Sequence, residues 1–361
     1  MVVLHICPLS DDLSNGVHIA VPQHVKAQRK YVDAALWNLG QPLKIDGLEQ
    51  VFTAASLEQL PPPYCRPDLA VFHELYIPRY LSLAKQLRRQ NIPYIIVPHG
   101  ALKKNAQKKS RLKKAAANLL LFKRFCNQAA GIQCLTAQEK AQSVMGKRIF
   151  IAPNGINPPP QTKTDFHIWG VRFVYVGRIL PYIKGLDLML QAFGAQKDFL
   201  ARHGCTLDIY GPADDRGVSY LPEMERLIAQ NGVDELVTLH PAVFGEDKHR
   251  VLLDADVFIQ TSRTEGMPMG VLEALSYGLP CLLSEGTTFA QTVADCDAGW
   301  NAGKTEPTIA ATLRQAVHAR QHFPEFSQNA LALSRQYSWD AAAKTAVGAY
   351  QSCVTSSTKE R

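Results

Sequence analysis

Two glutamates, Glu265 and Glu273, flank a Gly-Met-Pro sequence and lie eight positions apart. Carboxylates accept hydrogen bonds, so this pair is suited to holding the hydroxyl groups of a sugar and of a ribose. Pro268 favours the first position of a helix, Gly278 favours a helix C-terminal cap, and Pro280 prevents continuation. The spacing therefore predicts a helix that begins just after Glu265 and contains Glu273 two turns inside.

A strand-like run, Val257 to Gln260, comes directly before this helix. In an α/β protein, such a helix directs its first N–H groups and the positive end of its dipole toward the carboxyl edge of the sheet, where ligands bind. We therefore expect this helix N-terminus to hold a diphosphate. The alternative interpretation is that both glutamates are solvated helix charges.

Two cations follow another strand-like run, Phe173 to Val176. Arg178 comes after the strand, and Lys184 opens a helix whose apolar stripe is Leu186, Met189, Leu190 and Phe193. Arg binds phosphate through a planar fork and Lys as a point charge, so the two can neutralise a nucleoside diphosphate without a metal. The alternative is that both are ordinary surface cations.

These two blocks together resemble the signature of retaining glycosyltransferase family 4, whose members are glycosyl transferases of group 1 with the GT-B fold. The resemblance rests on Glu265-x7-Glu273 with its Gly-Met-Pro insert, and on the Gly177-Arg178 turn followed by Lys184-Gly185. It implies an α/β protein with two Rossmann-like domains that face each other across a cleft. It also implies a C-terminal helix that crosses back to the N-terminal domain.

The resemblance extends more weakly to other segments, which are Ser14-Asn15-Gly16-Val17, Val97-Pro98-His99-Gly100, Tyr210-Gly211-Pro212 and Val243-Phe244. It implies catalytic roles for Arg178, Lys184, Glu265 and His99. It implies donor binding by Gly16, Gly211, Phe244, Gly266, Met267, Pro268, Leu272 and Glu273. A lone histidine at a strand end is more often structural, so a structural role for His99 stays open.

The implied activity is transfer of a glycosyl unit from a nucleotide sugar to an acceptor hydroxyl with retention of configuration, in polysaccharide or glycolipid biosynthesis. A front-face displacement fits the sequence, in which no nucleophile is evident, and double displacement is the competing mechanism. A nucleotide-sugar epimerase or a phosphorylase of the same architecture is the alternative enzyme. The expected partners are a donor such as a UDP- or GDP-sugar and a saccharide or lipid-linked acceptor.

Two Asp-x-Asp pairs, Asp254/Asp256 and Asp295/Asp297, invite interpretation as metal ligands. The first precedes a strand and the second lies in a turn before Gly299-Trp300, so we expect no metal and no cofactor beyond the donor. A phosphate-binding P-loop is disfavoured as well, because the glycine that it needs before Gly303-Lys304-Thr305 is Ala298.

Strand-like and helical segments alternate in both halves of the 361 residues, which predicts two parallel sheets. The expected strands are Val2–Cys7, Leu69–His73, Tyr94–Pro98, Gly131–Leu135, Ile149–Ala152, Phe173–Val176, Thr206–Tyr210, Val237–His240, Val257–Gln260 and Cys281–Ser284. We expect an N-terminal acceptor-side domain at residues 1–154, a proline-containing linker at 155–167, a nucleotide-sugar domain at 168–335, and a C-terminal helix and tail at 336–361. That helix offers Trp339, Ala342, Ala346 and Tyr350 as one buried stripe.

Composition favours a soluble globular protein, because 46% of residues are hydrophobic and 20% are charged, and the scattered cysteines favour the cytoplasm. The first residues lack the pattern of a signal peptide, and the apolar runs are far shorter than a membrane span of roughly 20 residues. Eight cysteines without a C-x-x-C pair indicate reduced thiols rather than disulfides or zinc ligands.

The net charge of +7 is concentrated where acidic residues are missing, between Glu74 and Glu139. The basic segment, Lys103 to Arg124, suits an anionic membrane surface and a peripheral location on the inner membrane face, or simply a solvated helix. Leu112, Ala115, Leu119 and Phe122 have helical spacing within it. The alternative outside the enzymes is a binding module for anionic lipid or nucleic acid. Nucleic acid is disfavoured, because aromatic residues are not interleaved through Lys103 to Lys114.

Overall fold

The structure is a computed structural model that describes residues 1–11, 16–102, 121–146, 148–215 and 217–359. The chain forms two compact units. Unit 1 consists of Met1–Gly155 and Trp339–Arg361, and unit 2 consists of Ile156–Ser338. Each contains a parallel sheet with helices between its strands, so the predicted α/β class with two Rossmann-like domains is confirmed.

The described part of unit 1 is built on a seven-stranded parallel sheet with the order β3-β2-β1-β4-β5-β6-β7. Its strands are β1 (Val2–Cys7), β2 (Asp33–Asn38), β3 (Val51–Phe52), β4 (Leu69–His73), β5 (Tyr94–Val97), β6 (Gly131–Cys134) and β7 (Ile149–Ile151). Its helices are α1 (Gly16–Gln28), the 3-10 turn η1 (Leu57–Gln59), α2 (Pro78–Arg89), α5 (Lys123–Gln128), α6 (Ala137–Gln142) and α15 (Trp339–Lys359). The central strands β1 and β4 are almost wholly buried, as expected where helices cover both faces of a parallel sheet.

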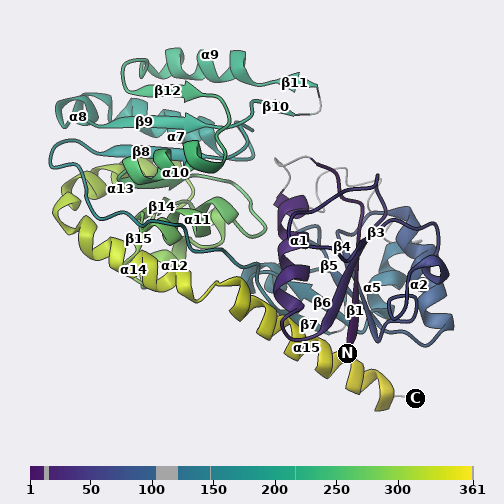
Figure 1. The fold of residues 1–361 in the computed structure, drawn as a ribbon. Helices are drawn as coiled ribbons and strands as arrows, with labels where there is room; N and C mark the ends of the chain where they lie inside the picture. Colours follow the sequence, from purple (N-terminus) through teal and green to yellow (C-terminus); the bar gives the residue numbers. More distant parts are fainter. Residues whose placement is uncertain (12–15, 103–120, 147, 216, 360–361) are drawn as a thin grey trace. The chain divides into compact units, whose positions relative to one another are not determined.

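The C-terminal helix α15 belongs to unit 1, although all of unit 2 separates it from the rest of that unit in sequence. It packs beside α1, as Figure 1 shows. The predicted stripe of Trp339, Ala342, Ala346 and Tyr350 is buried, which confirms that the helix returns to the N-terminal domain. Tyr350 is fully buried and donates a hydrogen bond to Gln133 Oε1 at 2.7 Å.

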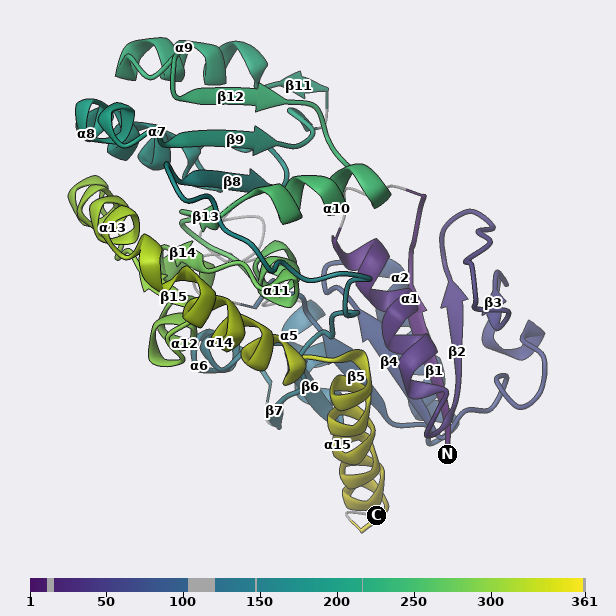
Figure 2. The ribbon, with the colours of Figure 1, turned by 60° about the vertical axis from the view of Figure 1, so that its left-hand side comes forward.

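The described part of unit 2 contains a six-stranded parallel sheet with the order β12-β9-β8-β13-β14-β15 (Figure 2). Its strands are β8 (Arg172–Val176), β9 (Thr206–Tyr210), β12 (Val237–His240), β13 (Val257–Gln260), β14 (Cys281–Leu283) and β15 (Gly299–Asn301), with a small hairpin of β10 (Asp214–Asp215) and β11 (Val218–Ser219). Its helices are α7 (Leu186–Ala195), α8 (Lys197–Arg202), α9 (Leu221–Asn231), α10 (Gly245–Asp254), α11 (Met269–Tyr277), η3 (Glu285–Thr287), α12 (Ala290–Asp295), α13 (Glu306–His318), η4 (Arg320–His322) and α14 (Phe323–Arg335).

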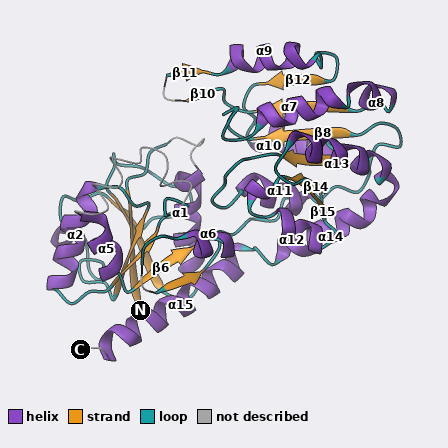
Figure 3. Ribbon diagram, turned by 180° about the vertical axis from the view of Figure 1, so that it is seen from behind, coloured by secondary structure: helices purple, strands orange, loops and turns teal. Residues whose placement is uncertain are grey.

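Helices cover this second sheet in two groups, drawn in purple around the orange strands in Figure 3. In one group α7 packs against α9 and α13, and in the other α11 packs against α10 and α14. The chain leaves β8 toward β9 and leaves β13 toward β14, in opposite directions along the sheet. Because parallel crossovers are right-handed, these opposite directions place α7 and α11 on opposite faces.

Both sheets therefore have a topological switch point, where consecutive connections diverge and leave a crevice at the carboxyl ends of the strands. In unit 1 it lies between β1 and β4, and in unit 2 between β8 and β13. Ligands of open α/β sheets bind at such crevices. The predicted polar residues of unit 2 follow these two strands, Arg178 and Lys184 after β8 and Glu265 after β13.

Candidate functional site

Lys184 and Glu265 meet at the switch point of unit 2. Lys184 Nζ lies 2.7 Å from Glu265 Oε1, and the two side chains are only 18% and 12% exposed. The same oxygen accepts hydrogen bonds from Gln260 Nε2 at 2.8 Å and from Ser262 Oγ at 2.6 Å. Three donors therefore fix the glutamate, and its carboxylate compensates the charge of Lys184.

Gly185 explains why the lysine reaches this position. It has a φ of 63° and precedes α7, which begins at Leu186, two residues later than the predicted start at Lys184. A Cβ at Gly185 would lie 2.0 Å from the carbonyl oxygen of Thr261, and the Thr261 hydroxyl donates to the Gly185 carbonyl at 2.7 Å. Only glycine combines this conformation with this close approach, so the loop before α7 is held directly against the end of β13.

Arg178 follows β8 by two residues and has an exposed side chain. The Tyr175 hydroxyl donates a hydrogen bond of 2.9 Å to the Arg178 carbonyl, which fixes the turn from inside. Gly211, after β9, packs on the same turn so closely that a Cβ there would lie 1.8 Å from the Gly177 carbonyl oxygen. Gly211 therefore has a structural reason to be glycine, besides the donor-binding role implied by the resemblance.

Helix α11 begins at Met269 with Pro268 as its N-cap, one residue later than the sequence pattern predicts, and ends at Tyr277, with Gly278 as a C-cap whose φ is 84°. The partly buried Gly266 and the buried Met267 lead into it. Its N-terminus carries a partial positive charge at the end of the loop that holds Glu265. Leu272 does not join the polar groups, because its side chain is fully buried and its N–H donates to the Pro268 carbonyl.

Glu273 lies inside α11 and pairs with Lys248 of α10, with 2.6 Å between Oε2 and Nζ. Both side chains are about a quarter exposed (26%). Phe244 is the N-cap of α10, and the residue is 53% exposed. Helix α10 thus links Phe244 and Glu273, two of the positions at which the resemblance implies donor binding.

His99 lies in unit 1, in a tight turn after β5. The turn is closed by a hydrogen bond from Ala101 N to the Pro98 carbonyl, and its central residues are left-handed, with φ of 48° at His99 and 85° at Gly100. The buried Glu139 carboxylate stabilises this turn, because it accepts hydrogen bonds from Gly100 N at 2.5 Å and from Leu135 N at 2.7 Å. Sequence reasoning overlooked Glu139, although Thr136-x-x-Glu139 is a helix capping pattern and the Thr136 side chain does accept from Glu139 N.

The side chain of His99 belongs to a group of buried or partly buried histidines. Its Nε2 lies 3.2 Å from His73 Nδ1, and His73 Nε2 lies 2.9 Å from His5 Nδ1. Burial lowers the pKa of His5 and of His99 to about 3 and that of His73 well below its usual value. His24, also buried, has its pKa lowered to about 4. All four rings are therefore neutral near pH 7.

Glu74 is a second group that sequence reasoning did not single out. It follows β4 beside the switch point of unit 1, with a φ of 69° that is uncommon outside glycine. Its N–H donates to the Val97 carbonyl at 2.9 Å, and burial raises the pKa of its carboxyl. A strained, partly buried carboxylate at a ligand-binding edge is a candidate functional group. The available sequence signal was an acidic residue directly after a buried strand.

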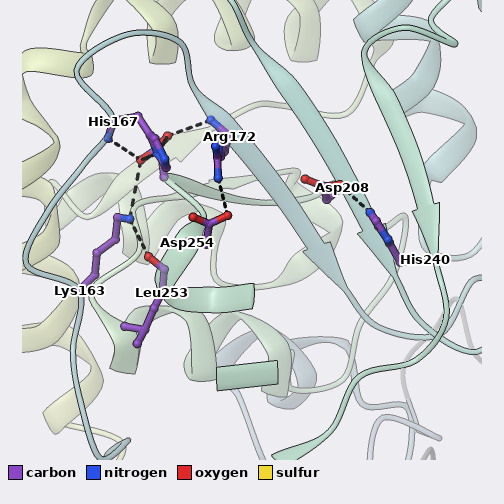
Figure 4. A network of polar contacts seen from close by, with 8 residues as sticks. Lys163, His167, Arg172, Asp208, His240, Leu253 and Asp254 are labelled. Atoms are coloured by element: carbon purple, nitrogen blue, oxygen red, sulfur yellow. Dashed lines mark hydrogen bonds and ion pairs between the residues drawn. The ribbon is translucent and has the colours of Figure 1, made fainter. Parts of the chain in front are cut away.

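The first Asp-x-Asp pair is engaged by protein groups. Asp256 is buried and accepts from the backbone N–H groups of His167 and Arg172 at 3.1 and 2.9 Å, with Lys163 Nζ 3.7 Å away. Asp254 pairs with the Arg172 side chain at 2.5 Å. Figure 4 shows Lys163, His167 and Arg172 converging on these carboxylates. A metal ion would have to displace these donors.

The second pair is divided between two elements. Asp295 is the last residue of α12 and accepts a hydrogen bond from Gln291, whereas Asp297 has a φ of 49° in the turn before β15. Within the described ranges, no group of three or more His, Cys, Asp or Glu residues could hold a metal ion.

The segment Ser14-Asn15-Gly16-Val17 and the basic segment lie largely outside the residues that the structure describes. Ser14 and Asn15 and residues 103–120 lie outside the described residues, whereas Gly16 is the exposed first residue of α1. Phe122 is buried, 5.1 Å from the ring of Tyr76, and therefore packs on the domain. None of the described helices combines the length and the apolar character that a membrane span needs.

Comparisons with known proteins agree with this arrangement. Residues 170–318 match the model of a family described as glycosyl transferases group 1. The chain is similar to a glycogen synthase from Marinomonas sp. (strain MWYL1), with 28% identity over 178 residues, which cover 47% of this chain and 35% of that protein. The match thus spans about a third of the length of this curated relative (35%).

Two solved structures share the fold over nearly the whole chain. One is sucrose-phosphate synthase from Thermosynechococcus elongatus, with a TM-score of 0.73 and 16% identity over 98% of this chain and 99% of the other. The second is HepE from Anabaena in complex with UDP-glucose, with a TM-score of 0.73 and 16% identity over 98% and 100%. At this identity the likeness concerns the fold. The segment of residues 170–318, which holds Arg178, Lys184, Glu265 and Glu273, belongs to the glycosyl transferases group 1 family.

Proposed function

We propose that this chain transfers a glycosyl unit from a nucleotide sugar, such as a UDP- or GDP-sugar, to a hydroxyl group of a saccharide or lipid-linked acceptor. We further propose that the anomeric configuration is retained and that the product is a polysaccharide or a glycolipid. The observation that carries the proposal is the contact of Lys184 with Glu265 at the switch point of unit 2. The family match and the UDP-glucose complex of HepE support a nucleotide-sugar donor.

The charges around this site suit a diphosphate. Arg178 is exposed, the N-terminus of α11 adds a partial positive charge, and Lys184 lies between them in the chain. Because Lys184 is paired with Glu265 before the donor binds, the donor would share this cation with the carboxylate. Glu265 would then accept a hydrogen bond from a sugar hydroxyl while Gln260 and Ser262 keep it in place.

The proposed reaction is a front-face displacement. The bond between the anomeric carbon and the diphosphate oxygen breaks, and its electron pair stays on the leaving phosphate. The acceptor oxygen bonds to the anomeric carbon from the same face, and its proton passes to that phosphate oxygen. Arg178, Lys184 and the α11 N-terminus would stabilise the growing negative charge, so no metal is required in this proposal.

Turnover of UDP- and GDP-sugars, measured in excess EDTA and again with Mg²⁺ or Mn²⁺, tests the proposal. We expect equal rates, and we expect Lys184→Ala to lower turnover more than it weakens donor binding, because the charge grows in the transition state. Lys304→Ala, which removes an exposed lysine paired with Glu285, serves as control and should leave the rates unchanged. Metal-dependent activity would refute the metal-free mechanism, and consumption of donor without any acceptor would favour an epimerase.

A further inference from the structure

The histidines behind His99 form a hydrogen-bonded row that leads from the end of β5 into the centre of unit 1. His99 contacts His73 of β4, and His73 contacts His5 of β1. His5 Nε2 in turn lies 3.0 Å from the side-chain oxygen of Gln28, the last residue of α1. His5, His73 and Gln28 are almost completely buried, and His99 is the partly exposed end.

The row continues beyond Gln28 to a second set of buried groups. The Gln28 side-chain nitrogen is buried without a hydrogen bond of good geometry among the described residues. The Tyr350 hydroxyl of α15 is its neighbour: burial raises the pKa of this phenol, and the nearby Gln28 side chain offsets part of that rise. Tyr350 is 2.7 Å from Gln133 Oε1, and Gln133 Nε2 is 2.9 Å from the Ala152 carbonyl oxygen.

The Ala152 carbonyl sets the direction of the first links, because a carbonyl oxygen can only accept. Gln133 must therefore turn its nitrogen to Ala152 and its oxygen to Tyr350. The Tyr350 hydroxyl then donates to Gln133, so the phenol oxygen can only accept on its other side, and the Gln28 amide is oriented with its nitrogen toward it. The Gln28 oxygen is left facing His5.

The same logic fixes each imidazole, because a neutral ring carries one N–H and one acceptor nitrogen. His5 must donate from Nε2 to Gln28, so its Nδ1 accepts from His73 Nε2. His73 Nδ1 then accepts from His99 Nε2. Burial lowers the pKa values of these rings far below 7, so each ring is neutral at pH 7 and carries a single N–H. What remains on His99 is an unprotonated Nδ1.

We propose that Gln133, Tyr350, Gln28, His5 and His73 are positioning residues that form a directional relay and hold His99 in the Nε2–H tautomer. His99 therefore offers its Nδ1 as a hydrogen-bond acceptor at the carboxyl edge of the sheet. Such a group selects a ligand that donates, such as a sugar hydroxyl, and rejects a carbonyl or phosphate oxygen at the same place. The statement about the sugar rests on the proposed function, whereas the tautomer is a property of the ligand-free protein.

Nitrogen-15 NMR of the full chain with labelled histidine tests the relay directly, because protonated and unprotonated ring nitrogens have well-separated shifts. The His99 signals are identified by their loss in His99→Gln. We expect the ligand-free wild type to show an unprotonated Nδ1 and a protonated Nε2 at His99. A protonated Nδ1 at His99 overturns the proposal, whatever reaction the protein catalyses.

Tyr350→Phe removes the hydroxyl that orients Gln28. Tyr350 lies more than ten residues inside α15, and His99 is not part of that helix. We expect it to shift His99 toward a mixture of tautomers and to lower turnover about fivefold, the effect of one neutral hydrogen bond. Tyr94→Phe is the matched control, since Tyr94 is equally buried and donates to the Phe125 carbonyl outside the relay. A folded Tyr350→Phe whose His99 spectrum equals that of Tyr94→Phe also overturns the proposal.

Discussion

The ion pair between Lys184 and Glu265 shows how one residue changes the electrostatics expected from sequence. Two cations and a helix dipole predict a site with excess positive charge, but the structure places the lysine 2.7 Å from a carboxylate. A partly buried pair of this kind avoids the cost of an isolated buried charge. In the proposed function, the donor would share this lysine with the carboxylate.

Glu265→Gln tests the role of the carboxylate, because it keeps the shape and removes the charge. We expect turnover to fall about tenfold to a hundredfold, the cost of losing a hydrogen bond to a charged group, with a smaller change in donor affinity. Glu273→Gln is expected to weaken donor binding more than turnover. Steady-state rates and calorimetric donor titrations separate the two. Wild-type kinetics in both variants would contradict the site, and Glu285→Gln provides an exposed control.

Glu74 is expected to cost the protein stability, because its pKa is raised by burial. The charged carboxylate is disfavoured in the fold, so the penalty is full above the raised pKa and fades as the pH falls through it. Glu74→Gln should therefore raise the midpoint of denaturant unfolding near pH 8, with a gain that shrinks toward pH 5. The exposed Glu49→Gln is the control, and equal gains in both variants would contradict the assignment.

At the scale of elements, the start of α7 depends on a single glycine. Gly185→Ala adds a Cβ at 2.0 Å from the Thr261 carbonyl oxygen and imposes a left-handed alanine. We expect a loss of more than about 2 kcal/mol in the free energy of unfolding, together with loss of the contact between Lys184 and Glu265.

Gly348→Ala is the matched control for this substitution. Gly348 lies within α15, and a Cβ there meets nothing within 4 Å. Alanine favours a helix over glycine by about 1 kcal/mol, so this variant should be neutral or more stable. Equal stability of the two variants in chemical denaturation would contradict the prediction that the close contact between Gly185 and the Thr261 carbonyl excludes a side chain.

Most strands could be predicted from the sequence because buried parallel strands are apolar runs. The predicted and observed ends differ by at most one residue, as in Tyr94–Pro98 against Tyr94–Val97. Strand β2 was missed because Asp33-Ala-Ala-Leu-Trp-Asn38 has the composition of a helix, and β15 because Gly299-Trp-Asn301 resembles a turn. Pairing with β1 and with β14 makes them strands, and pairing is not a local property.

At the scale of the whole molecule, the neutral histidines of unit 1 predict acid sensitivity. His5, His24 and His99 have pKa values lowered to about 3 or 4, whereas histidine in an unfolded chain titrates near 6.5. The unfolded state therefore takes up more protons, and stability falls as the pH drops from about 6.5 toward 4. Each such histidine costs up to about 1.4 kcal/mol per pH unit.

Hydrogen exchange of the β1 and β4 amides between pH 7.5 and 5 measures this effect within unit 1, after correction for the intrinsic pH dependence of exchange. The protection should weaken toward pH 5. His322→Gln, which changes an exposed histidine of unit 2, should leave the pH dependence unchanged. A corrected opening free energy that is constant over this range would contradict the neutral buried rings.

The candidate site could be predicted from sequence only where function is carried by short motifs. Glu265 and Glu273 lie within nine residues of each other, so their spacing was informative. The relay behind His99 could not be found this way, because Tyr350 and Gln133 are 217 positions apart. In the sequence its members look like ordinary core residues, and only the folded structure brings them within hydrogen-bonding distance of one another.

The return of α15 to unit 1 has a consequence for how the protein is made. Trp339 and Tyr350 complete the core of the domain that leaves the ribosome first, yet they are translated after all of unit 2. At about 5–20 residues per second, the N-terminal segment waits roughly 10–40 s for its last helix. During that interval the apolar face of α1 that packs on α15 in the finished protein has no partner from its own domain, so nascent unit 1 exposes hydrophobic surface until unit 2 has been made.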